Sequence, residues 1–351
     1  MSIRITRTTS PKPLPPADQL GFGQYFTDHL FFADFAGGKW NEGQIIPYQD
    51  FHLDPAASVL HYGQALFEGM KAFKHPGGEM FLFRPQFNAE RMRKGAERLS
   101  MEAPSNNLFI EGIRELLKAD ARWMPDGVGK SIYIRPTLIG TEGFLGVRPS
   151  NHFRFFVILS PVGQYYSGTS KAVKIFIEEE DLRAAPGGLG NTKAAANYAA
   201  SLRAALKAKH KGYAQVLWLD ASRKFVEEVG TMNIFFRVGD EVWTPRLSGS
   251  ILEGGTRACV IQLLKSYGTT VVEKDVALAD LNQAYSQGLL KEAFGTGTAA
   301  VITPIEEISS PKLKWSFSDF SDSSLSQKLY QDISSIQHGL SSDRFSWLVK
   351  V

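Results

Sequence analysis

The residue best placed for chemistry is Lys193, which lies between a run of small, turn-forming residues (APGGLGNT, 185–192) and an alanine-rich stretch typical of a helix (194–210). A lysine where the backbone turns tightly into a helix can point into a cleft. Desolvation there lowers the pKa of its amine and makes it a nucleophile toward carbonyl groups. Taken alone, a lysine at the start of a helix is more often a solvated surface residue, so the neighbouring motifs decide its interpretation.

Two adjacent carboxylates, Glu227 and Glu228, lie in an apolar stretch typical of a strand, FVEEVGTMNIFF (225–236). Strand alternation sends one of them inward, and a buried carboxylate is costly unless a cation meets it. A protonated pyridine nitrogen is one cation that would serve.

Two later segments offer backbone N–H groups and threonine hydroxyls that suit a phosphate: LEGGTR (252–257), which opens a predicted helix, and GTGTAA (295–300). Each by itself is more often a tight turn or a helix cap. Taken together, the lysine, the partnered carboxylate and the two phosphate cradles predict pyridoxal phosphate as the cofactor.

Other sites are not supported by the sequence. GFG (21–23) lacks the third glycine and the preceding strand of a dinucleotide fingerprint, and APGGLGNTK (185–193) does not have the P-loop order. The chain contains no HExxH, CxxC or GxSxG pattern, so neither a metal site nor a serine nucleophile elbow is expected.

Composition restricts the class of protein. The 351 residues carry a net charge of +3 and a single cysteine, which excludes a disulfide-stapled scaffold and gives no reason to expect a nucleic-acid or membrane partner. No apolar run approaches the ~20 residues of a membrane span. The absence of Asn-x-Ser/Thr acceptors and the lone Cys259 favour a cytoplasmic protein that binds small molecules.

The elements that must position these residues indicate an α+β protein. Strands are predicted at 81–84, 131–140, 153–159, 171–177, 213–219, 224–229 and 232–238, and helices at 88–99, 108–120 and 194–210, with more helix after 238. Within 131–140, alternation places Tyr133 and Arg135 on one face, whereas 153–159 is typical of a fully buried strand.

The predicted domains are 1–160 and 171–351, joined by a Gly-, Ser- and aromatic-rich loop at 161–170. Residues 1–20 are basic and proline-rich with no apolar h-region, so we expect a mobile, frayed arm rather than a secretory signal.

From about Asp34 to its end, the chain resembles the branched-chain amino acid aminotransferases of the fold-type IV pyridoxal-phosphate enzymes. The motifs that carry the resemblance are LHYGQALFEGMKAF (60–73), RPQFNAERM (84–92), YIRPTLIGTEGFLGV (133–147), LSPVG (159–163), GNTKAAANYA (190–199), QVLWLD (215–220), EVGTMNIF (228–235) and GTGTA (295–299). The resemblance implies a smaller N-terminal α/β domain, a larger C-terminal mixed-sheet domain and a homodimer with active sites near the subunit interface.

The resemblance also implies roles around the cofactor. Lys193 would form the Schiff base with pyridoxal phosphate and move a proton between the substrate Cα and C4′. Glu228 would pair with the pyridine N–H, and Tyr198 would hydrogen-bond the phenolic O3′. The phosphate would be held by Arg91, Gly255, Thr256 and Thr298, with Thr231 close to the ring or the phosphate.

For the substrate, the resemblance implies an apolar side-chain pocket of Tyr62, Phe67, Tyr133 and Tyr165, with Val147 entering from the other subunit. Such a pocket favours branched aliphatic chains by ~0.8 kcal/mol per buried methylene. Arg135 would help the pocket accept the second carboxylate of glutamate, directly or by orienting a tyrosine. The α-carboxylate would meet N–H groups at Thr298 and Ala299, and the loop that contains Tyr165 would close over the substrate.

The implied reaction moves the amino group of L-leucine, L-isoleucine or L-valine to 2-oxoglutarate. A D-amino acid aminotransferase or an aminodeoxychorismate lyase would share the fold and cofactor, and a non-catalytic binding protein on the same scaffold is a rival of another class. Two departures from the family pattern stand out. Glu253 replaces a proline common in relatives, and 299–304 (AAVITP) lacks the thiol pair that animal members carry.

Overall fold

The alternating sequence SIYIRPTLIG forms the strand β8 (Ser131–Gly140) in the computed structural model, which describes residues 3–163 and 172–351. Tyr133 and Arg135 share one face of β8, as predicted, and Arg135 Nη2 donates a hydrogen bond to Tyr133 Oη at 2.9 Å. The prediction of a fully buried partner strand is wrong for β9 (Phe153–Val162), because positions 154, 156 and 158 are partly exposed. Helix packing covers one face of β9 and leaves the other only partly covered.

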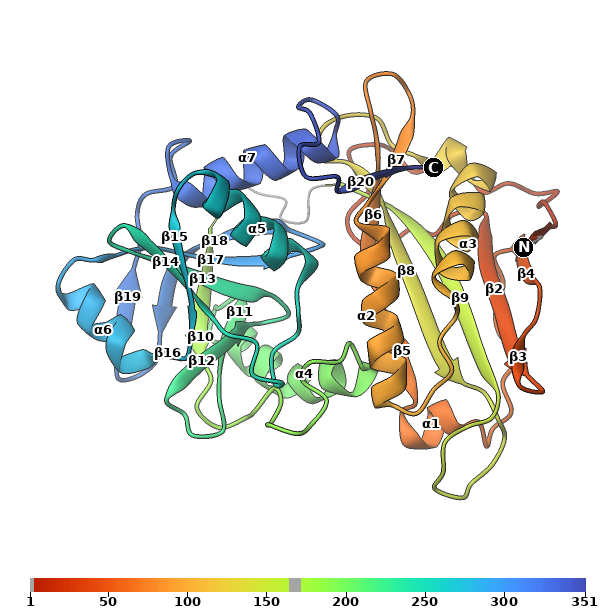
Figure 1. The fold of residues 1–351 in the computed structure, drawn as a ribbon, viewed down its shortest axis with the longest axis horizontal. Coiled ribbons are helices and arrows are strands. Elements are labelled where there is room, and N and C mark those ends of the chain that lie inside the picture. Colours follow the sequence, from red (N-terminus) through yellow and green to blue (C-terminus); the bar gives the residue numbers. More distant parts are fainter. Residues whose placement is uncertain (1–2, 164–171) are drawn as a thin grey trace. The chain divides into compact units, whose positions relative to one another are not determined.

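Within the described ranges, β8 and β9 lie in a ten-stranded sheet of the order β1-β4-β2-β9-β8-β6-β7-β20, with β3 beside β2 and β5 beside β8 (Figure 1). The other strands are β1 (Ile3–Ile5), β2 (His29–Ala36), β3 (Lys39–Trp40), β4 (Gly43–Pro47), β5 (Ala65–Phe67), β6 (Met70–Lys74), β7 (Met80–Phe83) and β20 (Leu348–Lys350). β1 runs parallel to β4, and the remaining pairs are antiparallel.

Two helices, α2 (Pro85–Arg98) and α3 (Asn106–Ala119), lie side by side on this sheet (Figure 1). The side chain of Ser105 caps α3 by accepting a hydrogen bond from Leu108 N, and the buried residues of α3 recur at helical spacing. Phe109 stacks on Phe155 of β9 with ring centroids 5.5 Å apart. A short helix, α1 (Ser58–Tyr62), and a 3₁₀ turn, η1 (Ala121–Trp123), complete this half.

The N-terminal arm, predicted to be frayed, is instead attached to this sheet. Strand β1 pairs with β4, and Thr8 N–H donates to His29 Nε2 at 2.9 Å. The other ring nitrogen of His29 lies 2.6 Å from Asp120 Oδ1, and Lys12 N–H donates to Asp28 at 2.8 Å. These partners lie far along the chain, which is why the local composition of the arm did not reveal them.

A second ten-stranded sheet is formed by strands between 173 and 316, within the described residues. Its order is β15-β14-β13-β17-β18-β10-β11-β12-β16, with β19 beside β18. The strands are β10 (Val173–Ile177), β11 (Gln215–Leu219), β12 (Phe225–Val229), β13 (Asn233–Val238), β14 (Glu241–Pro245), β15 (Thr270–Lys274), β16 (Val276–Ala277), β17 (Leu290–Gly297), β18 (Val301–Ser309) and β19 (Lys314–Ser316). Parallel and antiparallel pairs are mixed, which agrees with an α+β fold.

The prediction of more helix after residue 238 is confirmed by α5 (Gly255–Ser266), α6 (Leu278–Ser286) and α7 (Leu325–Gln337), but the strands β14 to β19 in the same region were not predicted individually. β17 and β18 are buried along most of their length. A strand covered on both faces has no period-two alternation, so its sequence does not distinguish it from a buried helix.

Helix α4 (Ala195–His210) forms close to its predicted bounds and packs on the second sheet. Ala204 and Ala208 of α4 contact Val216 and Trp218 of β11. The alternate residues of the same strand, Leu217 and Leu219, belong to the larger core on the other face, which α6 helps to cover. The Ala-rich sequence of α4 therefore provides a smooth surface for close packing against the strand.

The chain forms two compact units. Among the described residues, unit 1 holds 3–163, 192–196 and 334–351, and unit 2 holds 172–191 and 197–333. The stretch around Lys193 and the C-terminal stretch thus belong to unit 1, although the sequence placed both in 171–351. The reason for the C-terminal stretch is strand pairing, since β20 extends the first sheet at β7. Most of the predicted interdomain loop, 164–170, lies outside the described residues.

Candidate active site

Lys193 is held against β5 of unit 1 by backbone contacts. Phe67 N–H donates a hydrogen bond to Lys193 O at 3.2 Å, and Ala194 forms a β-bridge with Leu66. The ammonium group of Lys193 lies 4.7 Å from the centroid of the Phe67 ring. The lysine therefore points at an aromatic surface within unit 1 and is only partly exposed.

This environment changes the basicity of the amine. Burial, followed by the positive charge of Arg91, lowers the pKa of Lys193 to about 8, and the negative charge of Glu68 opposes the shift. Relative to a pKa of 10.5, the uncharged fraction at neutral pH rises by roughly 300-fold. The sequence-based expectation of a desolvated lysine agrees with this environment, and its role as a nucleophile stays a prediction.

Arg91, predicted to bind phosphate, extends from α2 and is held by the buried carboxylate of Glu68. Its Nε and Nη2 atoms donate to Oε1 and Oε2 of Glu68, each at 2.7 Å. Asn88 Nδ2 donates to the same Oε2 at 2.7 Å. The sequence analysis missed Glu68, whose only signal was a charged residue within the apolar stretch ALFEGM.

Three predicted substrate residues of unit 1 lie together. The guanidinium of Arg135 lies 4.6 Å from the Phe67 ring centroid and is hydrogen-bonded to Tyr133. Phe22 packs edge-on against Tyr133 with ring centroids 4.8 Å apart. Gly69 is needed here, because a Cβ atom at this position would collide with Tyr133 Oη.

The other predicted substrate residues are in different settings. Tyr62 is partly exposed, and its hydroxyl donates to Leu145 O. Val147 is 88% exposed in the same loop, and Tyr165 lies outside the described residues.

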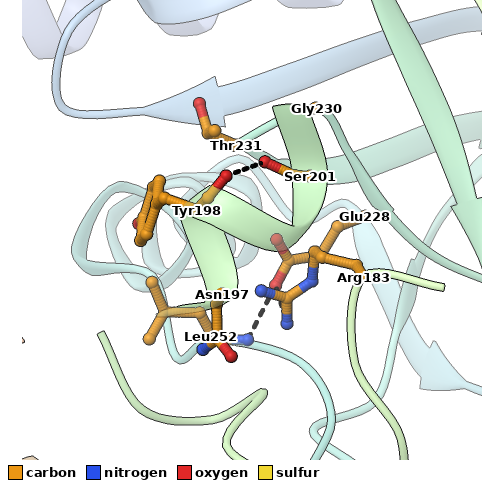
Figure 2. Close-up of a pocket in the computed structure, with 8 residues that line it drawn as sticks. All are labelled: Arg183, Asn197, Tyr198, Ser201, Glu228, Gly230, Thr231 and Leu252. Atoms are coloured by element: carbon orange, nitrogen blue, oxygen red, sulfur yellow. Dashed lines mark hydrogen bonds and ion pairs between the residues drawn. The ribbon is translucent and has the colours of Figure 1, made fainter. Parts of the chain in front are cut away.

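A small hollow in unit 2 contains several predicted cofactor residues (Figure 2). It is lined by Arg183, Asn197, Tyr198, Ser201, Glu228, Gly230, Thr231 and Leu252. Oε1 of Glu228 accepts a hydrogen bond from Leu252 N–H at 2.7 Å and lies 3.2 Å from Arg183 Nη2. Figure 2 shows the Arg183 guanidinium and the Glu228 carboxylate side by side. Arg183 was not predicted, and nothing in its local sequence distinguishes it from a surface arginine.

The expectation that only one of the paired carboxylates points inward is wrong, because both Glu227 and Glu228 are buried. β12 is covered on both faces along most of its length. Glu227 Oε1 accepts a hydrogen bond from Ser250 Oγ, while its Oε2 has no hydrogen-bond partner among the described residues. Burial raises the pKa of Glu227.

The two predicted phosphate cradles are also in unit 2. Gly254 precedes α5 in an extended conformation and has no side chain to cap the helix, and Gly255 and Thr256 are the first two residues of the helix, where backbone N–H groups suit an anion. Glu253 is exposed at this turn. In the other cradle, Thr298 and Ala299 form the turn between β17 and β18.

The arrangement agrees with known proteins. The family model of the class IV amino-transferases matches residues 65–308. The chain belongs to the class IV aminotransferases. A Bacillus subtilis (strain 168) protein named branched-chain-amino-acid aminotransferase 2 is 47% identical over 352 residues, which is 100% of this chain and 97% of that protein.

Solved structures of this class share the fold. A branched-chain aminotransferase of the archaeon Thermoproteus uzoniensis, solved with norvaline, is 24% identical with a TM-score of 0.75, covering 91% of this chain and 98% of that one. A T.th. branched-chain amino acid aminotransferase, complexed with N-(5′-phosphopyridoxyl)-L-glutamate, is 24% identical with a TM-score of 0.73, covering 90% and 97%.

The described residues of this aminotransferase contain neither a metal-binding cluster nor a membrane-spanning helix. The described ranges hold no cluster of three or more His, Cys, Asp or Glu side chains that could bind a metal ion. Nor does any helix in those ranges have the length and apolar character needed to cross a membrane.

Proposed function

We propose that this class IV aminotransferase uses pyridoxal phosphate to move the amino group of L-leucine, L-isoleucine or L-valine to 2-oxoglutarate. The observation that carries the proposal is the environment of Lys193, whose pKa of about 8 suits a carbonyl-reactive amine. Full-length identity of 47% to a named branched-chain enzyme supports the substrate class. A structural neighbour complexed with phosphopyridoxyl-glutamate supports the cofactor and the second substrate.

The residues present fit pyridoxal phosphate in charge and in donor type. Glu228 offers a buried carboxylate for a protonated ring nitrogen, and the N-terminal end of α5 carries the positive end of a helix dipole, which favours an anion. When bound, the cofactor supplies an aldehyde that condenses with amines and a ring that withdraws electrons from the substrate Cα. The remaining assignments are Tyr198 at O3′, Thr231 near the ring, and Arg91, Gly255, Thr256 and Thr298 at the phosphate.

Lys193 performs two tasks in this proposal. Its uncharged amine would hold pyridoxal phosphate through the aldehyde carbon, and the lowered pKa makes that form available near neutral pH. The same amine would also serve as the base and acid that moves the proton between the substrate Cα and C4′. The aromatic face of Phe67 beside the ammonium keeps bulk water away from this proton transfer.

The substrate pocket must accept both an apolar side chain and a second carboxylate. Phe67 and Tyr133 supply the apolar walls, to which we add Tyr62, Tyr165 and, from the other subunit, Val147. The N–H groups of Thr298 and Ala299 serve the α-carboxylate. Arg135 binds the glutamate side chain or orients Tyr133. The hydrogen bond between Arg135 and Tyr133 supports the second route.

We further propose a cytoplasmic homodimer. The loop that contains Phe144, Leu145 and Val147 exposes 44%, 64% and 88% of these apolar side chains, and Leu60 of α1 exposes 59%. A second copy of the chain that covered this loop would remove these side chains from water. The single cysteine is buried and reduced in this state, which suits a cytoplasmic protein.

The proposal is tested with the purified protein and pyridoxal phosphate. We expect bound cofactor, a change in its visible absorbance on adding L-leucine, and loss of transamination in Lys193→Ala. The proposal fails if the wild type binds no pyridoxal phosphate or if Lys193→Ala transaminates as well as the wild type. A panel of L-leucine, L-valine, D-alanine and 4-amino-4-deoxychorismate separates the related reactions, because activity with only the last two would overturn the substrate assignment.

A further inference from the structure

One arginine, Arg183, connects three segments of unit 2. Its Nη2 atom donates to Gly190 O at 2.9 Å, donates to Ser250 O, and lies 3.2 Å from Glu228 Oε1. Its side chain is 8% exposed. Gly190 belongs to the turn before Lys193, and Ser250 belongs to the segment that leads into α5. A single guanidinium therefore joins the turn, the segment before the phosphate cradle and the strand that carries Glu228.

The packing at Gly190 makes this cation necessary. A Cβ atom at position 190 would overlap Ser250 O and would lie 2.6 Å from Ala184 Cβ, so only glycine allows the two backbone segments to approach this closely. Two carbonyl oxygens and a carboxylate oxygen thus converge on one buried point. Such a concentration of negative charge is costly without a cation, and Arg183 supplies it.

The two neighbouring carboxylates near Arg183, Glu227 and Glu228, have different hydrogen-bond partners. Oε1 of Glu228 accepts a hydrogen bond from a backbone N–H and lies beside the guanidinium, so two donors fix its position. Glu227 receives the hydroxyl of Ser250, and Ser250 Oγ lies 2.8 Å from Ser248 Oγ. One arginine lies near two buried carboxylates, and its ion pair is with Glu228.

We propose that Arg183 is a positioning residue for Glu228: it holds the Glu228 carboxylate in place for the cofactor ring nitrogen. This inference rests on the proposed function, because it takes Glu228 as the partner of pyridoxal phosphate. Arg183 acts through Glu228, so its removal should have little effect once Glu228 can no longer carry a charge.

A double-mutant cycle tests the inference by measuring the Kd of the apoprotein for pyridoxal phosphate. In the wild-type background, Arg183→Met should weaken cofactor binding by roughly tenfold or more, the usual loss when a hydrogen bond to a charged group is removed. In the Glu228→Gln background, the same change should alter Kd by less than about threefold, because no carboxylate remains to be positioned. Equal effects in both backgrounds would show that Arg183 supports only the fold and would overturn the inference.

Arg183→Lys provides the second variant should the methionine variant fail to fold. Lysine keeps the charge, but its shorter side chain does not place an amine where Arg183 Nη2 lies, so an intermediate Kd that again depends on Glu228 is expected. A lysine variant equal to the wild type, or one whose defect persists in the Glu228→Gln background, would contradict the inference.

The control is Arg246→Met, since Arg246 forms an exposed ion pair with Asp275 in the same unit and should leave Kd unchanged. The two proposals fail in different ways. A wild-type protein that binds no pyridoxal phosphate overturns the proposed function. If the wild type binds the cofactor and Arg183→Met has the same effect on Kd in both backgrounds, only the role of Arg183 is overturned.

Discussion

Glu68 and Arg91 form a buried, bidentate ion pair in which both nitrogen–oxygen distances are 2.7 Å. This pair determines the charges next to Lys193, because Arg91 lowers and Glu68 raises the pKa of the amine. The arrangement explains how an arginine can remain beside a buried lysine. Its charge is balanced by a carboxylate that is itself inaccessible to water.

Glu68→Gln should therefore destabilise the protein by about 3–5 kcal/mol, the usual cost of leaving one partner of a buried pair uncompensated. It should also lower the pKa of Lys193 further, because the remaining positive charge of Arg91 is no longer balanced. Urea unfolding measures the first effect, and the pH dependence of the rate at which the apoprotein binds pyridoxal phosphate measures the second. Glu90→Gln on α2 is the control, since Glu90 pairs with the exposed Arg93. Unchanged unfolding and an unchanged pH midpoint in Glu68→Gln would contradict this prediction.

Lys193 should make the stability of the apoprotein rise with pH. Its folded-state pKa of about 8 lies below the unfolded value of 10.5, so between these values the unfolded chain binds more protons and the folded state gains stability as pH increases. At pH 7 the cost of burying the charged amine is about 3 kcal/mol. Lys193→Met should consequently be more stable than the wild type at pH 7, with the difference shrinking toward pH 10. Denaturant unfolding at both pH values checks this, and a difference that is independent of pH would refute it.

The sequence predicted those features whose causes are local. Lys193 was found from a glycine-rich turn followed directly by an alanine-rich helix, and the shared face of Tyr133 and Arg135 followed from alternation along one strand. The family resemblance then supplied roles that no local pattern contains.

The features that the sequence did not reveal depend on contacts between distant segments. Glu68 and Arg91 are 23 positions apart, and Arg183 and Ser250 are 67 apart. The attachment of the N-terminal arm rests on His29 and residues that approach it from elsewhere in the chain. Strands β17 and β18 were missed for a different reason, because strands buried on both faces lose the alternation that identifies them.

Gly190→Ala should damage unit 2 through sterics alone. The new Cβ would overlap Ser250 O, which is backbone and cannot rotate away, so we expect a loss of about 1–3 kcal/mol in the free energy of unfolding. Cofactor binding should weaken as well, because Ser250 leads into the predicted phosphate cradle. Gly163→Ala is the matched control, since the nearest atom to its Cβ would be Leu20 Cβ at 3.9 Å. Equal stability of the two variants would show that the Ser250 segment yields easily.

Removing the charge of Arg135 should lower the activity with glutamate more than the activity with leucine. Its guanidinium is hydrogen-bonded to Tyr133 and lies against Phe67, so Arg135→Met keeps an apolar surface but removes the charge available to a second carboxylate. We expect kcat/KM for glutamate to fall roughly 10- to 100-fold, the value of a charged hydrogen bond, and kcat/KM for leucine to change less than about threefold. Steady-state kinetics with both substrates measures the difference.

Tyr133→Phe separates the two ways in which Arg135 could act. If Arg135 works by orienting Tyr133, the phenylalanine variant should reproduce the glutamate defect, whereas direct contact between Arg135 and the substrate carboxylate predicts a much smaller one. Arg154→Met is the control, because Arg154 also lies over aromatic rings in unit 1, 4.9 Å from Phe32, and should leave both substrates unaffected. Equal losses for glutamate and leucine in Arg135→Met would mean that the arginine serves packing against Phe67, and that another group accepts the second carboxylate.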